Sequence, residues 1–219
     1  MSSDGGFDGY FLLSVTGQIE KADFPLHDYI WCKYCFATGQ DWTKLTGLDE
    51  GMTQTSIKGV GCNDQNNFNF PIDISWKSTN PFGWPQIVLH AYGVDVFGKD
   101  VLRGYGAVHV PMKIGSLVQM DISFENLNHR KRVSMFVPQS SSQLMKLNAW
   151  LTGKRPEFLN PKVIACGEGR GVTKVQTQGF VDIIFNIAVK NLQNLGYAND
   201  KKRETLTEDL LMLINKDPI

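Results

Sequence analysis

Residues 68–76 read Phe-Asn-Phe-Pro-Ile-Asp-Ile-Ser-Trp, and this stretch decides the fold class. Its even-numbered positions are all apolar, whereas its odd-numbered positions carry Asn, Pro, Asp and Ser. Alternation with a period of two is typical of a β-strand that buries one face. We therefore predict a strand here whose buried face is formed by Phe68, Phe70, Ile72, Ile74 and Trp76.

The same alternation returns near the other end of the chain, over 180–189. One face there carries Val181, Ile183, Phe185, Ile187 and Val189, and the other carries Asp182 and Asn186. Shorter apolar or aromatic runs predict further strands at 10–20, 29–37, 86–92, 106–112 and 132–137. Polar residues, Gly and Pro between them predict connections at 39–51, 59–67, 78–85 and 93–99. Seven or eight short strands separated by turns favour an antiparallel sandwich or barrel over an α/β fold.

Two helical segments are also predicted. Residues 141–152 place Leu144, Leu147 and Leu151 at helical spacing, and Gly153 follows as a stop signal. Residues 205–215 begin with Thr-Leu-Thr-Glu, the pattern of a capping box, and carry leucines on one face. The expected class is all-β with one or two short helices.

Composition limits the possible functions. The chain has 219 residues, enough for one sandwich with a sizeable core, and it contains 22 Lys plus Arg against 22 Asp plus Glu. A net charge of zero provides no overall attraction to nucleic acid or to anionic membranes. No apolar run of membrane-spanning length and no basic, apolar leader is present, so we expect an intracellular protein with reduced thiols. We expect a flexible N-terminus over 1–9, one domain over 10–197 and a tail over 198–219.

The cysteines present the strongest candidate for metal or redox chemistry. Cys32 and Cys35 have the two-residue spacing of zinc knuckles and redox motifs, whereas Cys62 and Cys166 are isolated. Residues three apart on a strand point to opposite faces, so the pair cannot share a metal unless the strand bends. We favour buried structural thiols and expect no zinc.

No other group of residues forms a recognisable catalytic or cofactor site. The histidines, His27, His90, His109 and His129, form no close pair. The glycine-rich run at 167–171 lacks the Lys-Ser/Thr of a phosphate loop and is expected to be a hairpin loop. We expect no catalytic residues, no metal and no cofactor, although a small enzyme that uses the thiols remains an alternative.

Three basic clusters, at 129–132, 154–155 and 201–203, could each meet phosphate head groups. Solvated loops or helix ends are the simpler interpretation, and we favour it because the chain has no net positive charge.

Several stretches resemble a known family. Residues 67–112 are similar to the middle of a C2 domain, in which an alternating strand and a turn precede an apolar strand and an acidic loop. The run Arg-Gly-Tyr-Gly-Ala-Val-His-Val-Pro at 103–111 closely resembles the B9 domain family, whose domain is C2-like. The resemblance covers about 10–197 and also rests on 39–42, 77–81, 83–89, 95–98, 135–138 and 167–170. The connection 113–130 and the tail after 197 depart from the family pattern.

The B9 resemblance implies a non-enzymatic scaffold of the transition zone and basal body at the base of the cilium. Its implied partners are B9 domain-containing protein 2 and the Meckel syndrome type 1 protein, in a membrane-associated complex that supports ciliogenesis and gates ciliary membrane proteins. The implied location is cytoplasmic, and any membrane contact is expected to be weak or indirect.

The C2 likeness leaves a second function open, a calcium-dependent phospholipid-binding module. Calcium takes six to eight oxygen ligands, and two loops here offer Asp23 and Asp28, then Asp95 and Asp100. Gly93 stands where the C2 pattern would place another acid. We therefore expect no tight calcium site, with these acids spread out, solvated and neutralised as surface pairs by Lys21, Lys99 and Arg103.

Overall fold

The architecture was obtained as a computed structural model. It describes residues 9–59, 64–95, 98–112, 129–139, 142–152, 157–158, 160, 162–167, 174–192 and 195. Within these ranges no helix is long and apolar enough to cross a membrane. The expected helix at 205–215 and the tail 198–219 lie outside them, so neither expectation is tested.

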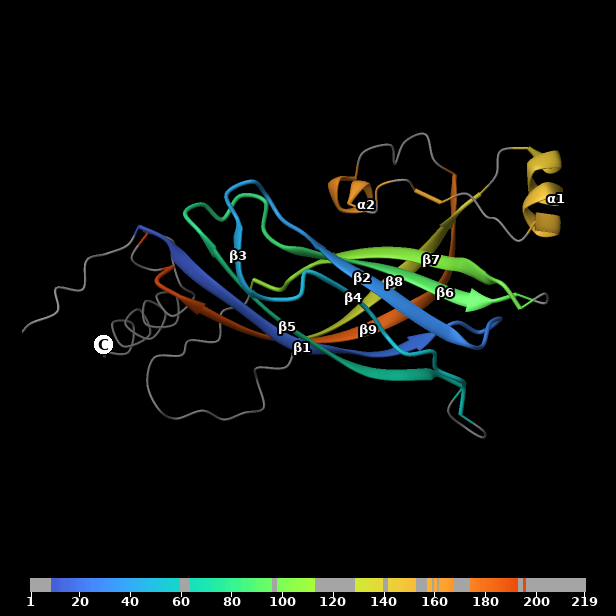
Figure 1. Ribbon diagram of the computed structural model, residues 1–219, viewed down its shortest axis with the longest axis horizontal. Coiled ribbons are helices and arrows are strands. Elements are labelled where there is room, and N and C mark those ends of the chain that lie inside the picture. Colours follow the sequence, from blue (N-terminus) through green and yellow to red (C-terminus); the bar gives the residue numbers. More distant parts are fainter. Residues whose placement is uncertain are drawn as a thin grey trace, which may run out of the picture.

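The described strands form one curled antiparallel sheet in the order β3-β5-β1-β9-β8-β7-β6-β2-β4. Figure 1 shows the sheet folded over itself, with β2, β6 and β7 in one layer and β1, β5 and β9 in the other. The expectation of an all-β, C2-like antiparallel sandwich with one or two short helices is confirmed. The strand bounds are β1 (Phe11–Asp23), β2 (Ile30–Ala37), β3 (Thr43–Gly47), β4 (Glu50–Met52), β5 (Asn66–Ser78), β6 (Gln86–Val94), β7 (Asp100–His109), β8 (His129–Pro138) and β9 (Val175–Lys190).

The two strands with the clearest alternation lie on either side of β1 in the sheet. β5 and β9 both pair with β1 over most of its length. Four of the five predicted apolar side chains of β5 are buried, Phe70 is only partly buried, and Asp73 faces solvent. On β9 the predicted inner face is buried through Ile187, and Val189 is partly buried. The hydrophobic effect therefore sets the orientation of both strands, as their sequences indicate.

The prediction of a loop over 39–51 was wrong, because β3 lies within this range and β4 begins in it. β3 pairs with β5 and β4 pairs with β2, so these two strands end the strand order at opposite edges of the sheet. Only Leu48 and Asp49 separate them in the chain, and the segment passes from one layer to the other. All five residues of β3 are exposed. Main-chain pairing with β5, rather than burial of side chains, holds this strand in the sheet. The sequence of β3 therefore shows no hydrophobic alternation.

Two of the boundaries that differ from the sequence predictions lie beside the turn between β6 and β7. β6 continues through Gly93 and Val94, which were expected to lie in a loop. β7 runs from Asp100 to His109, whereas a strand over 106–112 was expected. The register between β6 and β7 shifts between Ala91 and Tyr92, which pair with Gly104 and Leu102, so Arg103 is the extra residue of β7 at this point. Such a β-bulge inserts one residue and turns nearby side chains to a new direction.

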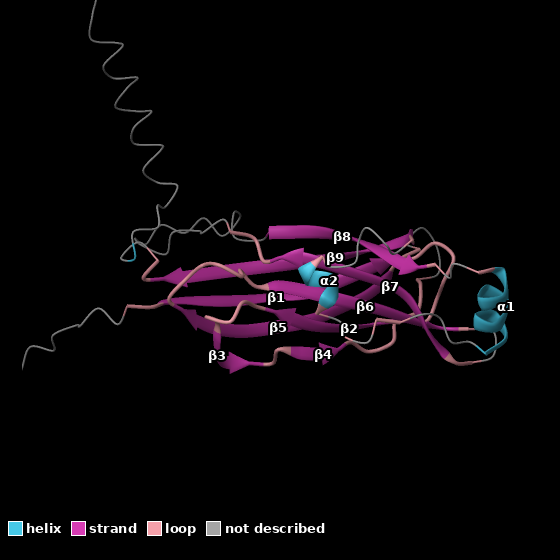
Figure 2. Cartoon of the chain, turned by 90° about the horizontal axis from the view of Figure 1, so that it is seen from above, coloured by secondary structure: helices cyan, strands magenta, loops and turns pink. Residues whose placement is uncertain are grey.

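The two helices are short and lie between β8 and β9. α1 (Gln143–Thr152) matches the helix expected over 141–152. α2 (Val163–Cys166) was not foreseen, and it ends at Gly167, a residue in the left-handed conformation. Residues 168–171 of the expected hairpin loop lie outside the described residues. Figure 2 shows α1 at one end of the sandwich, whereas α2 lies over its broad face.

A second, smaller core lies under α2, on the outer face of the sheet. Ile164 of α2 packs there with Cys35, Val88, Leu102 and Tyr105. The Tyr105 hydroxyl accepts a hydrogen bond from the backbone N–H of Phe158 at 3.1 Å, and the centroids of the two aromatic rings lie 5.2 Å apart. The segment between β8 and β9 is thus fixed to the sheet at α2.

Candidate functional site

The end of the sandwich that carries the acidic loops is the candidate site that the C2 likeness indicates. The turn after β1, the segment after β4 and the turn between β6 and β7 meet there. Ile30 shows this directly, because it pairs with Gly93 of β6 and forms a bridge with Ser56. The contacts of each acid at this end therefore decide whether the carboxylates could converge on an ion.

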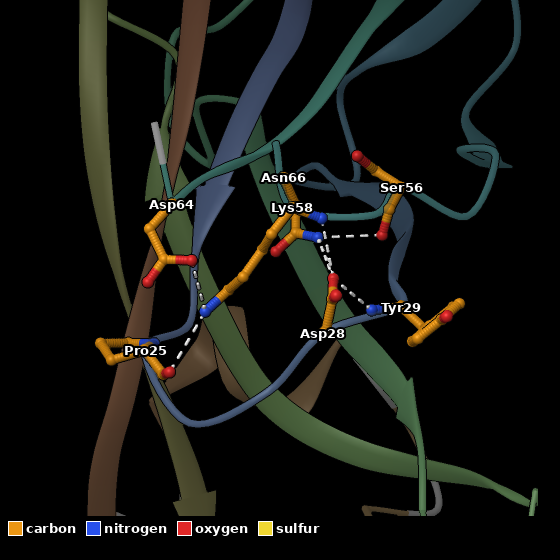
Figure 3. Close-up of polar contacts among 7 residues, drawn as sticks. All are labelled: Pro25, Asp28, Tyr29, Ser56, Lys58, Asp64 and Asn66. Carbon is orange, nitrogen blue, oxygen red and sulfur yellow. Dashed lines mark hydrogen bonds and ion pairs between the residues drawn. The ribbon is translucent and has the colours of Figure 1, made fainter. Parts of the chain in front are cut away.

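Asp28 is the centre of a polar network rather than a solvated acid (Figure 3). Its Oδ1 accepts hydrogen bonds from the backbone N–H groups of Tyr29 and Lys58, both at 2.8 Å. The same oxygen accepts a bond from Nδ2 of Asn66 at 3.2 Å. Tyr29 has a φ of 55°, a conformation that is unusual for a residue with a side chain. The carboxylate therefore fastens the turn after β1 to two distant segments.

Asn66 and Lys58 complete the network from the other side. Nδ2 of Asn66, a fully buried residue, also donates to the carbonyl of Ser56 at 2.9 Å. Nζ of Lys58 donates to the carbonyl of Pro25 at 3.1 Å and lies 3.4 Å from the carboxylate of Asp64. Sequence reasoning missed Asn66, Lys58 and Asp64, because polar residues in a connection give no sign that one of them is buried.

The network explains the acidity of Asp28. Burial alone would raise its pKa, but hydrogen bonds from the Lys58 and Tyr29 backbones, the Asn66 amide and the charge of Lys58 outweigh burial. The pKa of Asp28 is therefore held below its ordinary value, and the carboxylate is ionised with its donors already in place.

The other three acids take separate roles. Asp95 accepts a hydrogen bond from the backbone N–H of Lys99 at 2.9 Å, within the turn between β6 and β7. Asp100 is exposed and accepts a hydrogen bond from the Trp31 indole at 3.3 Å. Asp23 ends β1 and is half-buried. Among the described residues, no group of three or more His, Cys, Asp or Glu side chains could hold a metal ion.

Arg103 occupies the space that a larger residue at position 93 would need. A Cβ placed on Gly93 would lie 2.8 Å from Cδ1 of Ile30, 3.2 Å from Cγ of Arg103 and 3.3 Å from its Nε. Nη2 of Arg103 donates to the carbonyl of Val94 at 2.8 Å. Arg103 was expected to form an ordinary surface pair, and this was wrong, because only 7% of the residue is exposed. The β-bulge at this point draws its side chain into the end of the sandwich.

The thiols lie as the strand geometry predicts. Cys32 is fully buried in the main core, whereas Cys35 belongs to the second core on the opposite face of β2. Burial raises the pKa of Cys32 to about 12, and it also raises the pKa of Cys35. Both thiols are therefore protonated at neutral pH and poorly reactive. Cys166 is exposed, and Cys62 lies outside the described residues.

The histidines and the first basic cluster are dispersed. His90 is buried beside Tyr105, with ring centroids 4.9 Å apart, and burial lowers its pKa to about 4. His27, His109 and His129 lie on other elements or loops. In the cluster at 129–132, Arg130 pairs with Glu20, and Arg132 binds Asp182 through two hydrogen bonds at 2.8 and 3.0 Å. The clusters at 154–155 and 201–203 lie outside the described residues.

Comparison with known proteins supports one family. The family described as "Ciliary basal body-associated, B9 protein" matches residues 13–188. B9 domain-containing protein 1 of Mus musculus and of Homo sapiens are each 51% identical over 187 residues, covering 85% of this chain and 86% of each relative. B9 domain-containing protein 2 of Danio rerio is 29% identical over 184 residues, covering 84% of this chain and 97% of that protein. The chain therefore belongs to the B9 domain family of ciliary basal body-associated proteins.

Proposed function

We propose that this chain is a non-enzymatic scaffold subunit of a protein assembly at the ciliary transition zone. Its partners in the proposal are B9 domain-containing protein 2 and the Meckel syndrome type 1 protein. The assembly would support ciliogenesis and the gating of ciliary membrane proteins from the cytoplasmic side. Identity of about half over most of the chain to relatives of a ciliary family is the observation that carries the proposal.

The two terminal strands of the sheet, β3 and β4, carry the surface that we assign to protein contact. Leu45, Leu48 and Met52, here termed the β3–β4 surface, are 47%, 69% and 65% exposed. They lie on or between the strands that end the strand order, and terminal strands keep main-chain donors and acceptors for a further strand. Apolar side chains beside such groups suit a partner with an edge strand of its own, as another B9 domain would have.

The experiment is affinity purification of the tagged chain from ciliated cells, followed by mass spectrometry of the bound proteins. We expect both named partners with the wild-type chain, and a loss of at least one of them with Leu48→Glu combined with Met52→Glu. The control is Phe82→Ser, because Phe82 is 80% exposed in the turn between β5 and β6. Absence of both partners from the wild-type sample would contradict the scaffold role. If the variant with Leu48→Glu and Met52→Glu retained both partners, only the assignment of the β3–β4 surface would be contradicted.

A further inference from the structure

Lys58 is a basic residue whose side chain is almost buried at the end of the sandwich that carries the acidic loops. Only 12% of this side chain is exposed, although Asp64, its ion-pair partner, is 75% exposed. An ammonium group loses its hydration when it is buried, so a lysine is rarely buried unless acceptor oxygens replace the lost water. The surroundings of Lys58 therefore have to provide the interactions of a cation-binding site.

Oxygen atoms from two other segments contact the ammonium group (Figure 3). Nζ of Lys58 donates a hydrogen bond to the carbonyl of Pro25 at 3.1 Å and lies 3.4 Å from Oδ1 of Asp64. Pro25 belongs to the turn after β1, Asp64 precedes β5, and Lys58 itself follows β4. Because an ammonium group has three N–H donors, one lysine can join several segments that each offer an oxygen.

Two further side chains add negative potential beside the ammonium group. Burial alone would raise the pKa of Asp28, but the charge of Lys58 is among the interactions that lower it. Asn66 is fully buried, and its Oδ1 accepts no hydrogen bond within the part of the chain that the structure describes. Figure 3 shows this oxygen pointing away from Ser56, to the side on which Lys58 meets Asp64. A buried acceptor without a donor is stabilised by a positive charge nearby, because the low local dielectric strengthens their attraction.

We propose that these oxygens form a binding site for an ammonium group, and that Lys58 occupies it as a cation built into the chain. No described group of three or more His, Cys, Asp or Glu side chains could hold a metal ion, which agrees with a site for a single, hydrogen-bonding cation. A calcium-dependent module obtains the cation at its loop end from solution. Here the chain supplies the cation, so the three segments stay joined at any metal concentration. This inference goes beyond the proposed scaffold role and does not depend on it.

The test removes the ammonium group of Lys58 and offers a free one to the purified full chain. Propylammonium has the same heavy atoms as the part of the side chain that Lys58→Ala lacks. We expect this variant to melt about 4–8 °C below wild type by calorimetry. Propylammonium chloride, titrated to about ten times its dissociation constant, should raise the melting temperature of the variant by about 3–6 °C. Sodium chloride at the same concentration, and propanol, which lacks the charge, should have no such effect.

The matched control is Lys44→Ala, which removes the lysine of a different ion pair. Nζ of Lys44 lies 2.8 Å from Asp49, but the two side chains are 43% and 56% exposed. An ion pair in water contributes little to stability, so this variant should melt close to the wild type. Propylammonium should not stabilise it, because no buried site is opened.

Stabilisation of Lys58→Ala by propylammonium alone would support the ammonium site. An equal effect of sodium chloride would show general screening, and an equal effect of propanol would show that only the apolar stem matters, so either result would overturn the proposal. It would also be overturned if the variant did not respond to propylammonium, or if propylammonium or calcium chloride stabilised the wild type, whose site is already filled. If Lys58→Ala does not fold in sodium chloride, circular dichroism in propylammonium decides. A recovered β-sheet spectrum would support the site, and an unfolded chain in both salts would overturn it.

Discussion

Replacement of Asp28 distinguishes a structural carboxylate from a calcium ligand. In the structure this side chain fastens the turn after β1 to the backbone of Lys58 and to the buried amide of Asn66. If that is its role, Asp28→Ala must destabilise the protein in the complete absence of calcium. If it were a calcium ligand instead, its removal would relieve repulsion between carboxylates in the ion-free protein.

The size of the effect follows from the number of donors and from their exposure. Asp28→Ala leaves three donors without their acceptor, and a hydrogen bond to a charged group contributes about 1.5–3 kcal/mol when it is buried. One oxygen serves all three bonds, and water reaches this partly exposed site, so we expect a total loss of about 2–3 kcal/mol. Asp28→Asn retains a carbonyl-type acceptor and should lose only about 1 kcal/mol. For a domain of this size, the alanine variant should melt about 4–10 °C lower.

The pH dependence provides a second, independent readout. Because the pKa of Asp28 is lower in the folded than in the unfolded protein, its stabilisation is complete above the unfolded value of about 3.9. It disappears as the pH falls through the folded pKa. Stability of the wild type should therefore fall more steeply below about pH 4 than stability of Asp28→Asn.

The assay is urea unfolding in a calcium chelator, repeated with added calcium, with the melting temperature followed by calorimetry. We expect the loss of stability to be the same in both conditions, and calcium to leave the wild type unchanged. A calcium-dependent rise in the wild-type melting temperature that Asp28→Asn abolishes would refute this reasoning and favour the calcium-dependent phospholipid module. An ion-free Asp28→Ala protein as stable as wild type would refute it as well.

Three further substitutions and one chemical modification test the fold. Gly17→Ala should lower the free energy of unfolding, measured in urea, by more than about 4 kcal/mol, because the new Cβ would lie 2.0 Å from a backbone oxygen of β9. Gly98→Ala should lower it by only about 1 kcal/mol, because Gly98 has a positive φ but open space around it. Ile74→Ala, at a fully buried position, should cost about 2–5 kcal/mol in the same assay. Alkylation with iodoacetamide at neutral pH should modify exposed Cys166 rapidly and buried Cys32 only as the protein unfolds, as mass spectrometry of peptides would record.

The sequence predicts this fold wherever a strand has one buried face. β5 and β9 alternate because their inner side chains pack in the core, so the pattern and the burial have the same cause. β3 and β4 show no such alternation, because their side chains do not pack in the core. Their side chains are almost entirely exposed, and their positions depend on hydrogen bonds to β5 and β2. The positions of β3 and β4 could not be predicted from residues 43–52, because the strands with which they pair are determined by how the whole sheet folds.

The candidate site was less predictable than the fold. Asp28 was recognised as an acid in a loop, but its partners lie 30 and 38 residues away in the chain. Arg103 was assigned to the surface, because nothing in the sequence shows that a β-bulge leaves it beside Gly93. In both cases the role depends on which segments meet at the end of the sandwich, and that is a tertiary property.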